Sequence, residues 1–273
     1  ARPGDEVICE TGAHFLHFEG GSVAAHLGLM MRPVPGVRGT LQPEDVERLI
    51  RPGNEHNPRS AVVAIENTHN SAGGAVFPIE TARAIANLCR ERGVKVHLDG
   101  ARLFNAQVAT GTPAAEWAAC ADTVTFCFSK GLGAPIGSMV CSTADAIAEG
   151  RRVRKRMGGG MRQVGVIAAA ARVALDTGIE RLAEDHANAT RLAQGLADLD
   201  SACVDLASVE TNMVYVDLSP WRLLAPDVAE RLRTEGVLTL GFPGSSMRLV
   251  THRDVDIADI DRTLLAFKKV LLA

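Results

Sequence analysis

The chain has 273 residues, of which 47% are hydrophobic, and a formal net charge of −3. This length and hydrophobic content can supply the core of one large domain or two ordinary ones. The slight acidity gives no reason to expect a nucleic acid or an anionic membrane surface as a partner. No apolar run approaches the roughly 20 residues of a membrane span, and the N-terminus lacks the apolar core of a signal peptide. Six scattered cysteines without a C-x-x-C motif predict reduced thiols in a cytoplasmic protein and not metal ligands.

Apolar runs alternate with helical patterns in the first half of the chain. Strands are predicted at residues 7–9, 60–65, 94–98 and 123–128, and helices at 21–31, from 41 onward and at 78–92. Pro43 marks the start of the second helix and Gly93 the end of the third. This order predicts a mainly parallel sheet covered by helices, in which ligands bind at the carboxyl ends of the strands.

The second half of the chain begins with a long helical pattern at residues 145–177, broken by three glycines at 158–160. A glycine inside a helix costs roughly 1 kcal/mol relative to alanine, so the glycines indicate close approach to a ligand or a second subunit. The pattern changes at Gly178, and further elements are expected at 178–199, 213–216, 225–235, 247–250 and 257–271. We therefore expect a large domain at 1–177 and a small α+β domain at 178–273.

Asp99 and Lys130 each follow a predicted strand and are 31 residues apart. An amine on a Ser/Gly-flanked loop beside a strand-end carboxylate is the layout that pyridoxal 5′-phosphate (PLP) chemistry needs. The lysine forms a Schiff base with the cofactor aldehyde, and the carboxylate keeps the pyridine nitrogen protonated. Apolar neighbours such as Phe126 and Phe128 suit an amine that must lose its proton. Each residue alone would be interpreted as a surface lysine or a capping aspartate, whereas the pair in this context favours the cofactor site.

Six runs of sequence occur in the order typical of one enzyme family. On these runs the chain resembles the low-specificity L-threonine aldolases, in the β-eliminating-lyase branch of the fold type I PLP enzymes. The resemblance implies an α/β fold of the fold type I PLP-dependent transferase type and a PLP-dependent aldehyde-lyase. The implied reaction cleaves L-threonine or L-allo-threonine to glycine and acetaldehyde. The runs are residues 65–70, 97–106, 128–135, 158–163, 211–213 and 248–252.

The resemblance also implies which residues bind the cofactor. Lys130 matches the Schiff-base lysine of the family and Asp99 its pyridinium partner. His14 matches the histidine that stacks on the cofactor ring. Lys155 and Arg162 match basic residues that reach the cofactor phosphate from a neighbouring subunit, so the resemblance implies a homodimer or homotetramer. Without the resemblance, His14 would be an ordinary packed or capping histidine, and the basic run around Lys155 a solvated helix face.

Three further residues are implied at the substrate. Arg102 and Arg248 match the arginines associated with the substrate carboxylate, which a guanidinium can bind with two parallel hydrogen bonds. His56 matches the histidine near the substrate hydroxyl. By themselves, His56 would be an exposed loop residue and Arg248 a surface residue of a strand. The sequence does not distinguish threonine from allo-threonine or larger β-hydroxy amino acids.

The N-terminal part of the chain departs from the family pattern. Fold type I enzymes hold the cofactor phosphate at a loop before a helix, where backbone N–H groups favour an anion. In the family that loop precedes the run that starts here at Pro3. The first strand and the phosphate loop are therefore expected to be missing, either because the chain is a fragment or because it is a shortened homologue.

Two alternatives to the aldolase stay open on sequence alone. One is another fold type I enzyme, a β-eliminating lyase or an aminotransferase. The other is a non-catalytic, oligomerising fragment that retains the scaffold. The pair His14 and His56 favours the aldolase, because retro-aldol cleavage needs a base at the β-hydroxyl. Nicotinamide, ATP and metal sites are not expected, because the corresponding glycine-rich motifs and ligand spacings do not occur.

Overall fold

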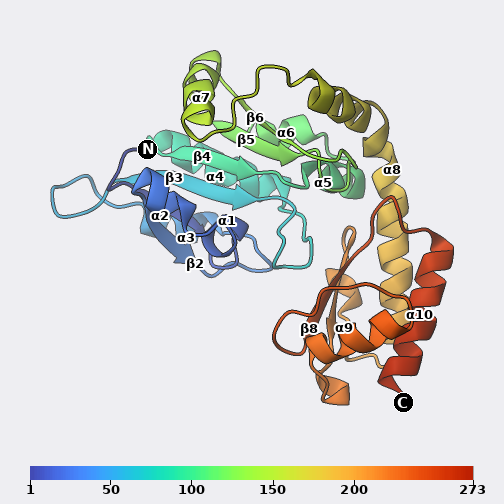
Figure 1. The fold of residues 1–273 in the computed structure, drawn as a ribbon. Coiled ribbons are helices and arrows are strands. Elements are labelled where there is room, and N and C mark those ends of the chain that lie inside the picture. The colour runs from blue at the N-terminus through green and yellow to red at the C-terminus, as the bar shows by residue number, and fades with distance from the viewer. Residues whose placement is uncertain (273) are drawn as a thin grey trace. The chain divides into compact units, whose positions relative to one another are not determined.

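The structure is a computed structural model and describes residues 1–272. The chain forms two compact units, the first spanning Ala1–Ile179 and the second beginning at Glu180 (Figure 1). Helix α8 (Gly165–Ala197) belongs to both, because the division falls within it. Among residues 1–272, none of the helices combines the length and the apolar character that crossing a bilayer requires.

A six-stranded sheet forms the centre of the first unit, with the strand order β2-β1-β3-β4-β5-β6. The first five strands are mutually parallel, and β6 pairs antiparallel with β5. The mainly parallel sheet predicted from the alternating pattern is thus confirmed. The strands are β1 (Glu6–Glu10), β2 (Met30–Val34), β3 (Ser60–Glu66), β4 (Lys95–Asp99), β5 (Thr123–Cys127) and β6 (Ser138–Ser142).

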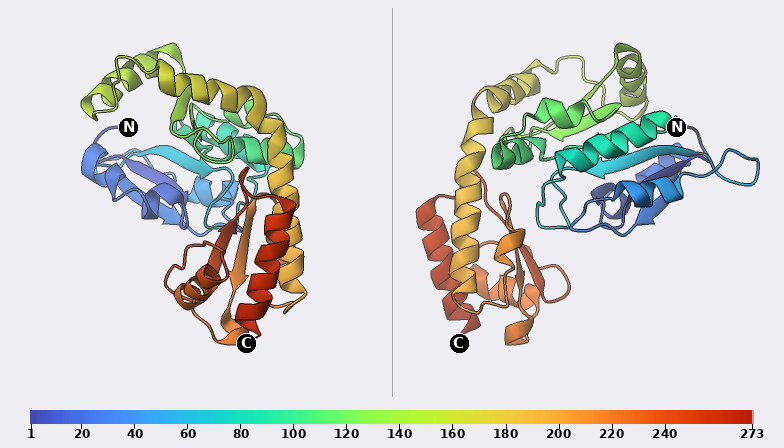
Figure 2. Two further views of the ribbon diagram at one scale, coloured as in Figure 1. Left: turned by 45° about the vertical axis from the view of Figure 1, so that its right-hand side comes forward. Right: turned by 180° about the vertical axis from the view of Figure 1, so that it is seen from behind.

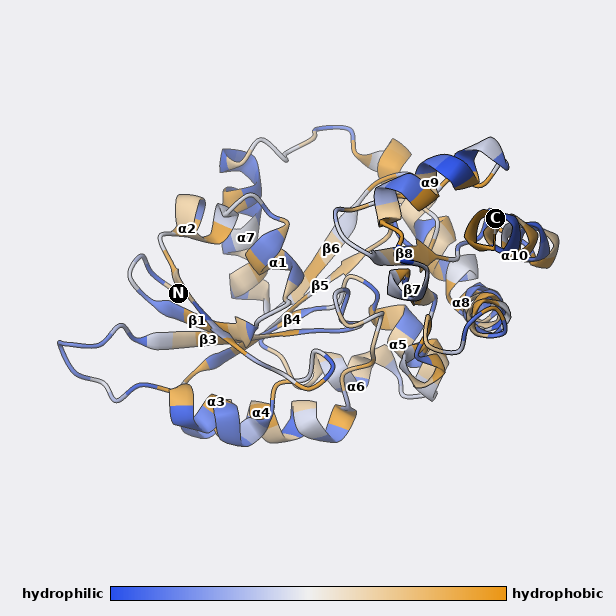
Figure 3. Ribbon diagram, turned by 90° about the horizontal axis from the view of Figure 1, so that it is seen from below, coloured by the Kyte–Doolittle hydropathy of each residue, from blue (hydrophilic) through white to orange (hydrophobic). Residues whose placement is uncertain are grey.

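Helices cover both faces of this sheet, as the view along it shows (Figure 3). One face carries α3 (Pro43–Leu49), α4 (Ile79–Glu91) and α6 (Ala114–Ala118). The other face carries α1 (His14–His17), α2 (Ser22–Leu27) and α7 (Ala144–Arg156). Helix α5 (Leu103–Thr110) follows β4. A helix on each side explains why the central strands are almost continuously apolar.

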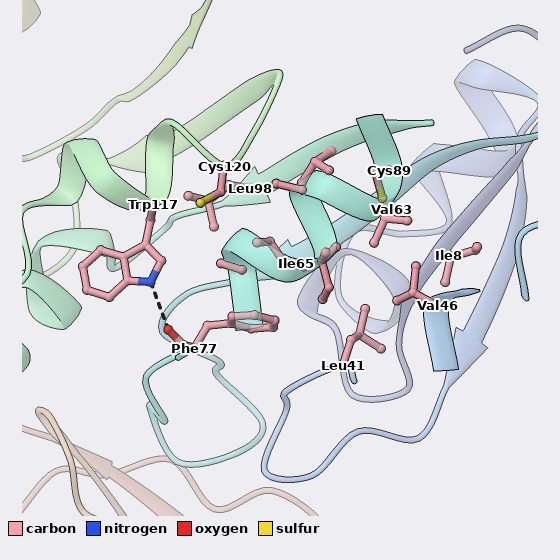
Figure 4. Packing of buried hydrophobic residues seen from close by; sticks show 14 of the residues in the cluster. Ile8, Leu41, Val46, Val63, Ile65, Phe77, Cys89, Leu98, Trp117 and Cys120 are labelled. Atoms are coloured by element: carbon pink, nitrogen blue, oxygen red, sulfur yellow. Dashed lines mark hydrogen bonds between the residues drawn. The ribbon is translucent and has the colours of Figure 1, made fainter. Parts of the chain in front are cut away.

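The larger core of the first unit lies under α3, α4 and α6 (Figure 4). Ile8, Val63 and Leu98 of the sheet are fully buried there. Trp117 is 1% exposed and donates its indole N–H to the carbonyl oxygen of Phe77 at 3.0 Å. Because an unpaired indole N–H would be costly in an apolar interior, this bond lets the largest side chain of the core be buried completely.

Two sequence predictions about helices are wrong in detail. Residues 21–31 were expected to form one helix, but α2 ends at Leu27, Gly28 takes φ +63°, and Met30 begins strand β2. Pro33 is tolerated in β2 because this strand lies at the edge of the sheet. The three glycines at 158–160 lie between helices and not within one, because α7 ends at Arg156.

The second unit is a small α+β arrangement, as the sequence predicts. Strands β7 (Met213–Asp217) and β8 (Ser246–Val250) pair antiparallel. They pack with α9 (Ala225–Thr234), α10 (Ile257–Leu271) and the C-terminal half of α8 around one apolar core. Helix α10 runs alongside α8 (Figure 2), and a Cβ at Gly195 would collide with the side chain of Leu264.

Candidate active site

Four parallel strands end side by side at one edge of the large sheet. The last residues of these strands are Glu10 in β1, Glu66 in β3, Asp99 in β4 and Cys127 in β5. Asp99 is in register with Glu66 on one side and with Thr125 on the other. Neighbouring strands lie about 4.8 Å apart, so the loops that follow them share one small area. This edge is where ligands of open α/β sheets bind.

The backbone around Asp99 is held on both sides. Asn67 donates its N–H to the carbonyl oxygen of Asp99 at 2.8 Å, and Gly100 donates to that of Thr125 at 2.8 Å. Only glycine fits at position 100, because a Cβ there would lie 2.7 Å from the Thr125 oxygen. The Asp99 carboxylate accepts a hydrogen bond from Ala101 N at 3.2 Å. The chain thus presents a half-buried carboxylate in a fixed position at the end of β4.

Lys130 lies on the loop that follows the neighbouring strand β5. This loop is closed by bonds from Phe128 N to Gly137 O at 3.0 Å and from Ala134 N to Phe128 O at 3.0 Å. Gly133 N donates to the carbonyl oxygen of Lys130 itself at 2.9 Å. Lys130 is half-buried. An amine and a carboxylate on adjacent strand ends fit PLP, which needs a nucleophile for its aldehyde and an anion for its ring nitrogen.

A cavity of about 600 Å³ lies on the sheet face that carries α1, α2 and α7. Asp99 lines it at one end, but neither Lys130 nor His14 is among the described residues that do. His97 also lines it and lies 2.7 Å from Thr123 through Nδ1 and Oγ1. Burial lowers the pKa of His97, although the charge of Asp99 opposes this shift. The apolar wall consists of Val7, Phe15, Val23, Leu27, Leu29, Val62, Ala64 and Val96.

His14 lies at the start of α1, in the loop that follows β1. Its backbone N–H donates to Glu66 Oε2 at 2.8 Å, which ties this loop to the end of β3. Its imidazole Nε2 lies 3.2 Å from Glu19 Oε1, and its ring centroid is 5.2 Å from that of Phe18. The side chain is 33% exposed. His14 therefore lies at the same edge of the sheet as Asp99, with β3 between their strands.

The two predicted substrate arginines lie in different units. Arg102 directly precedes α5, and its Nη1 lies 3.5 Å from Asn70 Oδ1 in the loop after β3. It therefore belongs to the edge that carries Asp99. Arg248 is half-buried in β8 of the second unit, where it is in register with Tyr215. There it lines a cavity of about 340 Å³ with Thr251 and His252.

Three other predicted site residues are exposed. His56 has a side chain that is 84% exposed, and its loop precedes β3. Within one chain His56 therefore lies at the amino edge of the sheet, opposite the edge that carries Asp99. Lys155 lies in the last turn of α7, and Arg162 lies between α7 and α8. Every residue from 148 to 166 is exposed, so both basic side chains extend from an uncovered part of the surface.

Two buried carboxylates at this edge, Glu10 and Glu66, were not predicted as site residues. Glu10 accepts hydrogen bonds from Thr11 Oγ1 at 2.7 Å and from Gly36 N at 3.1 Å, and it also accepts one from Gly12 N. Burial raises the pKa of Glu10, but these bonds outweigh it, so the net shift is downward. An acidic residue as the last member of an apolar strand was the signal that could have identified both.

The chain is similar in sequence to proteins of one known family. The sequence pattern of the family described as Beta-eliminating lyase matches residues 1–219. A low-specificity L-threonine aldolase 1 of Arabidopsis thaliana is 37% identical, covering 98% of this chain and 76% of its own. A low specificity L-threonine aldolase of Escherichia coli K12 is 38% identical, covering 92% of this chain and 73% of its own.

Solved structures share the same architecture. A threonine aldolase of Leishmania major superposes with a TM-score of 0.80 at 23% identity, covering 99% of this chain and 79% of that one. A Thermus thermophilus aspartate aminotransferase variant gives 0.71 at 21% identity, covering 99% and 71%. At these identities the structures establish the fold, which is that of the fold type I PLP enzymes. The match over residues 1–219, together with the relatives at 37–38% identity, shows that the chain belongs to the Beta-eliminating lyase family.

Proposed function

We propose that this protein is a PLP-dependent aldolase that cleaves L-threonine or L-allo-threonine to glycine and acetaldehyde. The observation that carries the proposal is the placement of Asp99 and Lys130 on adjacent strand ends, in a chain 37% identical to a threonine aldolase over 98% of its length. In the reaction the Cα–Cβ bond breaks, the β-hydroxyl loses its proton, and Cα gains one. Bound PLP supplies the electron-accepting ring that such a cleavage needs.

Lys130 and Asp99 are the residues that would hold the cofactor. The Lys130 amine is the nucleophile that would hold the cofactor aldehyde. The Asp99 carboxylate, fixed by its backbone bonds to β3 and β5, keeps a proton on the pyridine nitrogen through an ion pair. His14 follows β1 at the same edge and is suited to cover the face of the ring.

Arg102 and Arg248 are the residues proposed to bind the substrate carboxylate. Arg102 lies at the edge that carries Asp99, and its guanidinium contacts Asn70. Arg248 is proposed for the same carboxylate because it lies in the run at residues 248–252 that resembles the threonine aldolases. His14 is the candidate base for the β-hydroxyl within one chain, because it lies at the same edge of the sheet as Asp99. His56 lies at the opposite edge of that sheet. His56 would therefore serve the site of a neighbouring subunit.

We also propose that a second copy of the chain helps to bind the cofactor phosphate. The uncovered stretch at 148–166 contains apolar side chains that are 39–79% exposed, at Val153, Met157, Met161, Val164 and Val166. Apolar side chains grouped in this way are typical of interfaces. Packed against a partner, this stretch would carry Lys155 and Arg162 to the partner's cofactor phosphate. Six free cysteines agree with the reducing conditions of the cytoplasm.

The proposal is tested by the products formed from L-threonine in the presence of PLP. An aldolase yields glycine and acetaldehyde in equal amounts without any keto acid. A β-eliminating enzyme would instead release ammonia and a keto acid, and an aminotransferase would act only when a keto acid acceptor is added. Either of these two outcomes, without glycine, would replace the proposed reaction by another of the same fold.

A further inference from the structure

Glu66 is a buried carboxylate whose two oxygens both bind the backbone of loops. It ends strand β3 and is 4% exposed. Oε2 accepts a hydrogen bond from His14 N at 2.8 Å, and Oε1 accepts one from Asn70 N at 2.8 Å. One of these loops follows β1 and the other follows β3 itself, so a single side chain joins two loops at the carboxyl edge of the sheet.

This arrangement requires a carboxylate, because both oxygens of the side chain must accept a hydrogen bond. Burying a charged group is costly unless hydrogen bonds compensate it, and the two N–H donors supply that compensation. A glutamine would present an amide NH₂ to one of the two N–H groups and lose that bond. An aspartate is shorter by one methylene and could not reach both loops. The position therefore requires glutamate if both loops are to stay where they are.

Both loops carry residues of the proposed site. His14, whose backbone N–H donates to Glu66, is the first residue of α1. Asn70 contacts Arg102 through Oδ1 and Nη1 at 3.5 Å. Glu66 itself is in register with Asp99. The carboxylate thus connects one residue proposed to bind the cofactor with one proposed to bind the substrate, from a position directly beside the pyridinium partner.

We propose that Glu66 is a positioning residue, whose buried carboxylate sets the backbone of His14 and of Asn70 and thereby the imidazole and guanidinium at the active site. The inference deepens the proposed function and rests on it, because it takes His14 and Arg102 to be site residues. Glu66 does not contact the reacting atoms in this role. Its effect passes through two backbone hydrogen bonds.

The test compares Glu66→Gln with Glu6→Gln. Glu6 is a matched control, because it is 1% exposed and is the first residue of β1, at the amino edge of the same sheet. There it pairs with Arg32 at 3.2 Å and Arg51 at 3.0 Å, away from the His14 loop. Both variants remove one buried charge, so a loss of general stability affects them alike. Only Glu66→Gln alters the bonds to His14 and Asn70.

The first readout needs no cofactor. Hydrogen exchange of individual backbone amides, followed by NMR, should be at least about tenfold faster at His14 or Asn70 in Glu66→Gln, because a bonded amide exchanges only when its bond opens. Glu6→Gln should leave both amides protected. Glu66→Asp is the second variant if the first does not fold, and it should lose protection at one of the two loops. Unchanged exchange at both amides would overturn the inference.

The second readout uses the enzyme loaded with PLP. Glu66→Gln should lower kcat/KM about tenfold in the wild-type background and by a smaller factor in a His14→Ala background, where only the effect through Asn70 remains. The circular dichroism of the bound cofactor should change with Glu66→Gln and not with Glu6→Gln. Fully additive losses would overturn the coupling. A wild-type protein without aldolase activity would reject the proposed function, whereas the amide exchange would still decide whether Glu66 holds the two loops.

Discussion

The imidazole Nε2 of His69 lies 3.1 Å from Oε2 of Glu10, and both side chains are at least 90% buried. The two groups lie close together without hydrogen-bond alignment, and the imidazole is one of the causes that lower the pKa of Glu10. Gly36 and Gly39 border the pair, since a Cβ at either position would collide with Glu10 or His69. This cluster closes the loop between β2 and α3 over the end of β1.

Glu10 should make the protein sensitive to acid. Its folded-state pKa lies below the ordinary value of 4.5. The stabilisation is therefore complete above about pH 4.5 and is lost as the pH falls through the lower, folded-state pKa. Glu10→Gln should cost about 1–3 kcal/mol at neutral pH and flatten the acid limb of the stability curve. Urea unfolding between pH 3 and pH 7 measures this, and an unchanged acid limb would contradict it.

Asp99→Asn should remove most of the activity without unfolding the protein. An amide cannot hold a proton on a pyridine nitrogen as a carboxylate does, so kcat should fall on the order of 100-fold or more. The amide can still accept the bond from Ala101 N, so the loop should keep its conformation. Steady-state kinetics at saturating PLP, with circular dichroism as the fold control, provides the measurement. A kcat within twofold of wild type would exclude the pyridinium role.

Arg102→Ala and Arg248→Ala test the proposed carboxylate site. A charge-assisted hydrogen bond contributes on the order of 1.5–3 kcal/mol, so each change should lower kcat/KM by at least about tenfold. PLP affinity should stay the same, because neither residue is proposed to bind the cofactor. Titrating PLP into each variant distinguishes binding of the substrate carboxylate from binding of the cofactor phosphate. Recovery of activity by excess PLP would show that the arginine binds the phosphate instead.

Trp117→Phe tests the account of the large core. The change leaves the Phe77 carbonyl oxygen without its indole donor and opens a small cavity. Together these effects should destabilise the first unit by about 1–3 kcal/mol. Trp221→Phe in the second unit is the control, because Trp221 is only partly buried. Denaturant midpoints followed by far-UV circular dichroism for the whole chain, and by the fluorescence of Trp221 for the second unit of the Trp117→Phe variant, would show whether the loss is confined to the first unit.

The sequence predicted those elements whose signal is local. The continuous apolar strand at Ser60–Glu66 and the final helix with its 3–4 spacing were both recognisable from side-chain pattern alone. Strand β2 was missed because Met30–Val34 is short, contains a proline, and follows a helical pattern. Its place depends on pairing with β1, which no local pattern reveals.

In the candidate site, too, some features could be predicted from sequence and others could not. Asp99 and Lys130 could be paired from sequence, because parallel strand ends share one edge. The bond between His14 and Glu66 spans 52 residues and joins a backbone donor to a side chain, so spacing alone could not predict it. The role of His56 was predicted from a family motif, which could not show that its loop lies at the amino edge of the sheet in its own chain.

The attachment of PLP to Lys130 can be tested by chemical labelling of the cofactor lysine. Borohydride reduction of the PLP-treated protein fixes the cofactor on the lysine that binds it, and peptide mass spectrometry identifies that lysine. The chain offers four competitors, Lys95, Lys155, Lys268 and Lys269. We expect one cofactor per chain on the peptide that contains Lys130, and none on the Lys130→Ala variant. Stoichiometric labelling of another lysine, or labelling that persists in the variant, would contradict it.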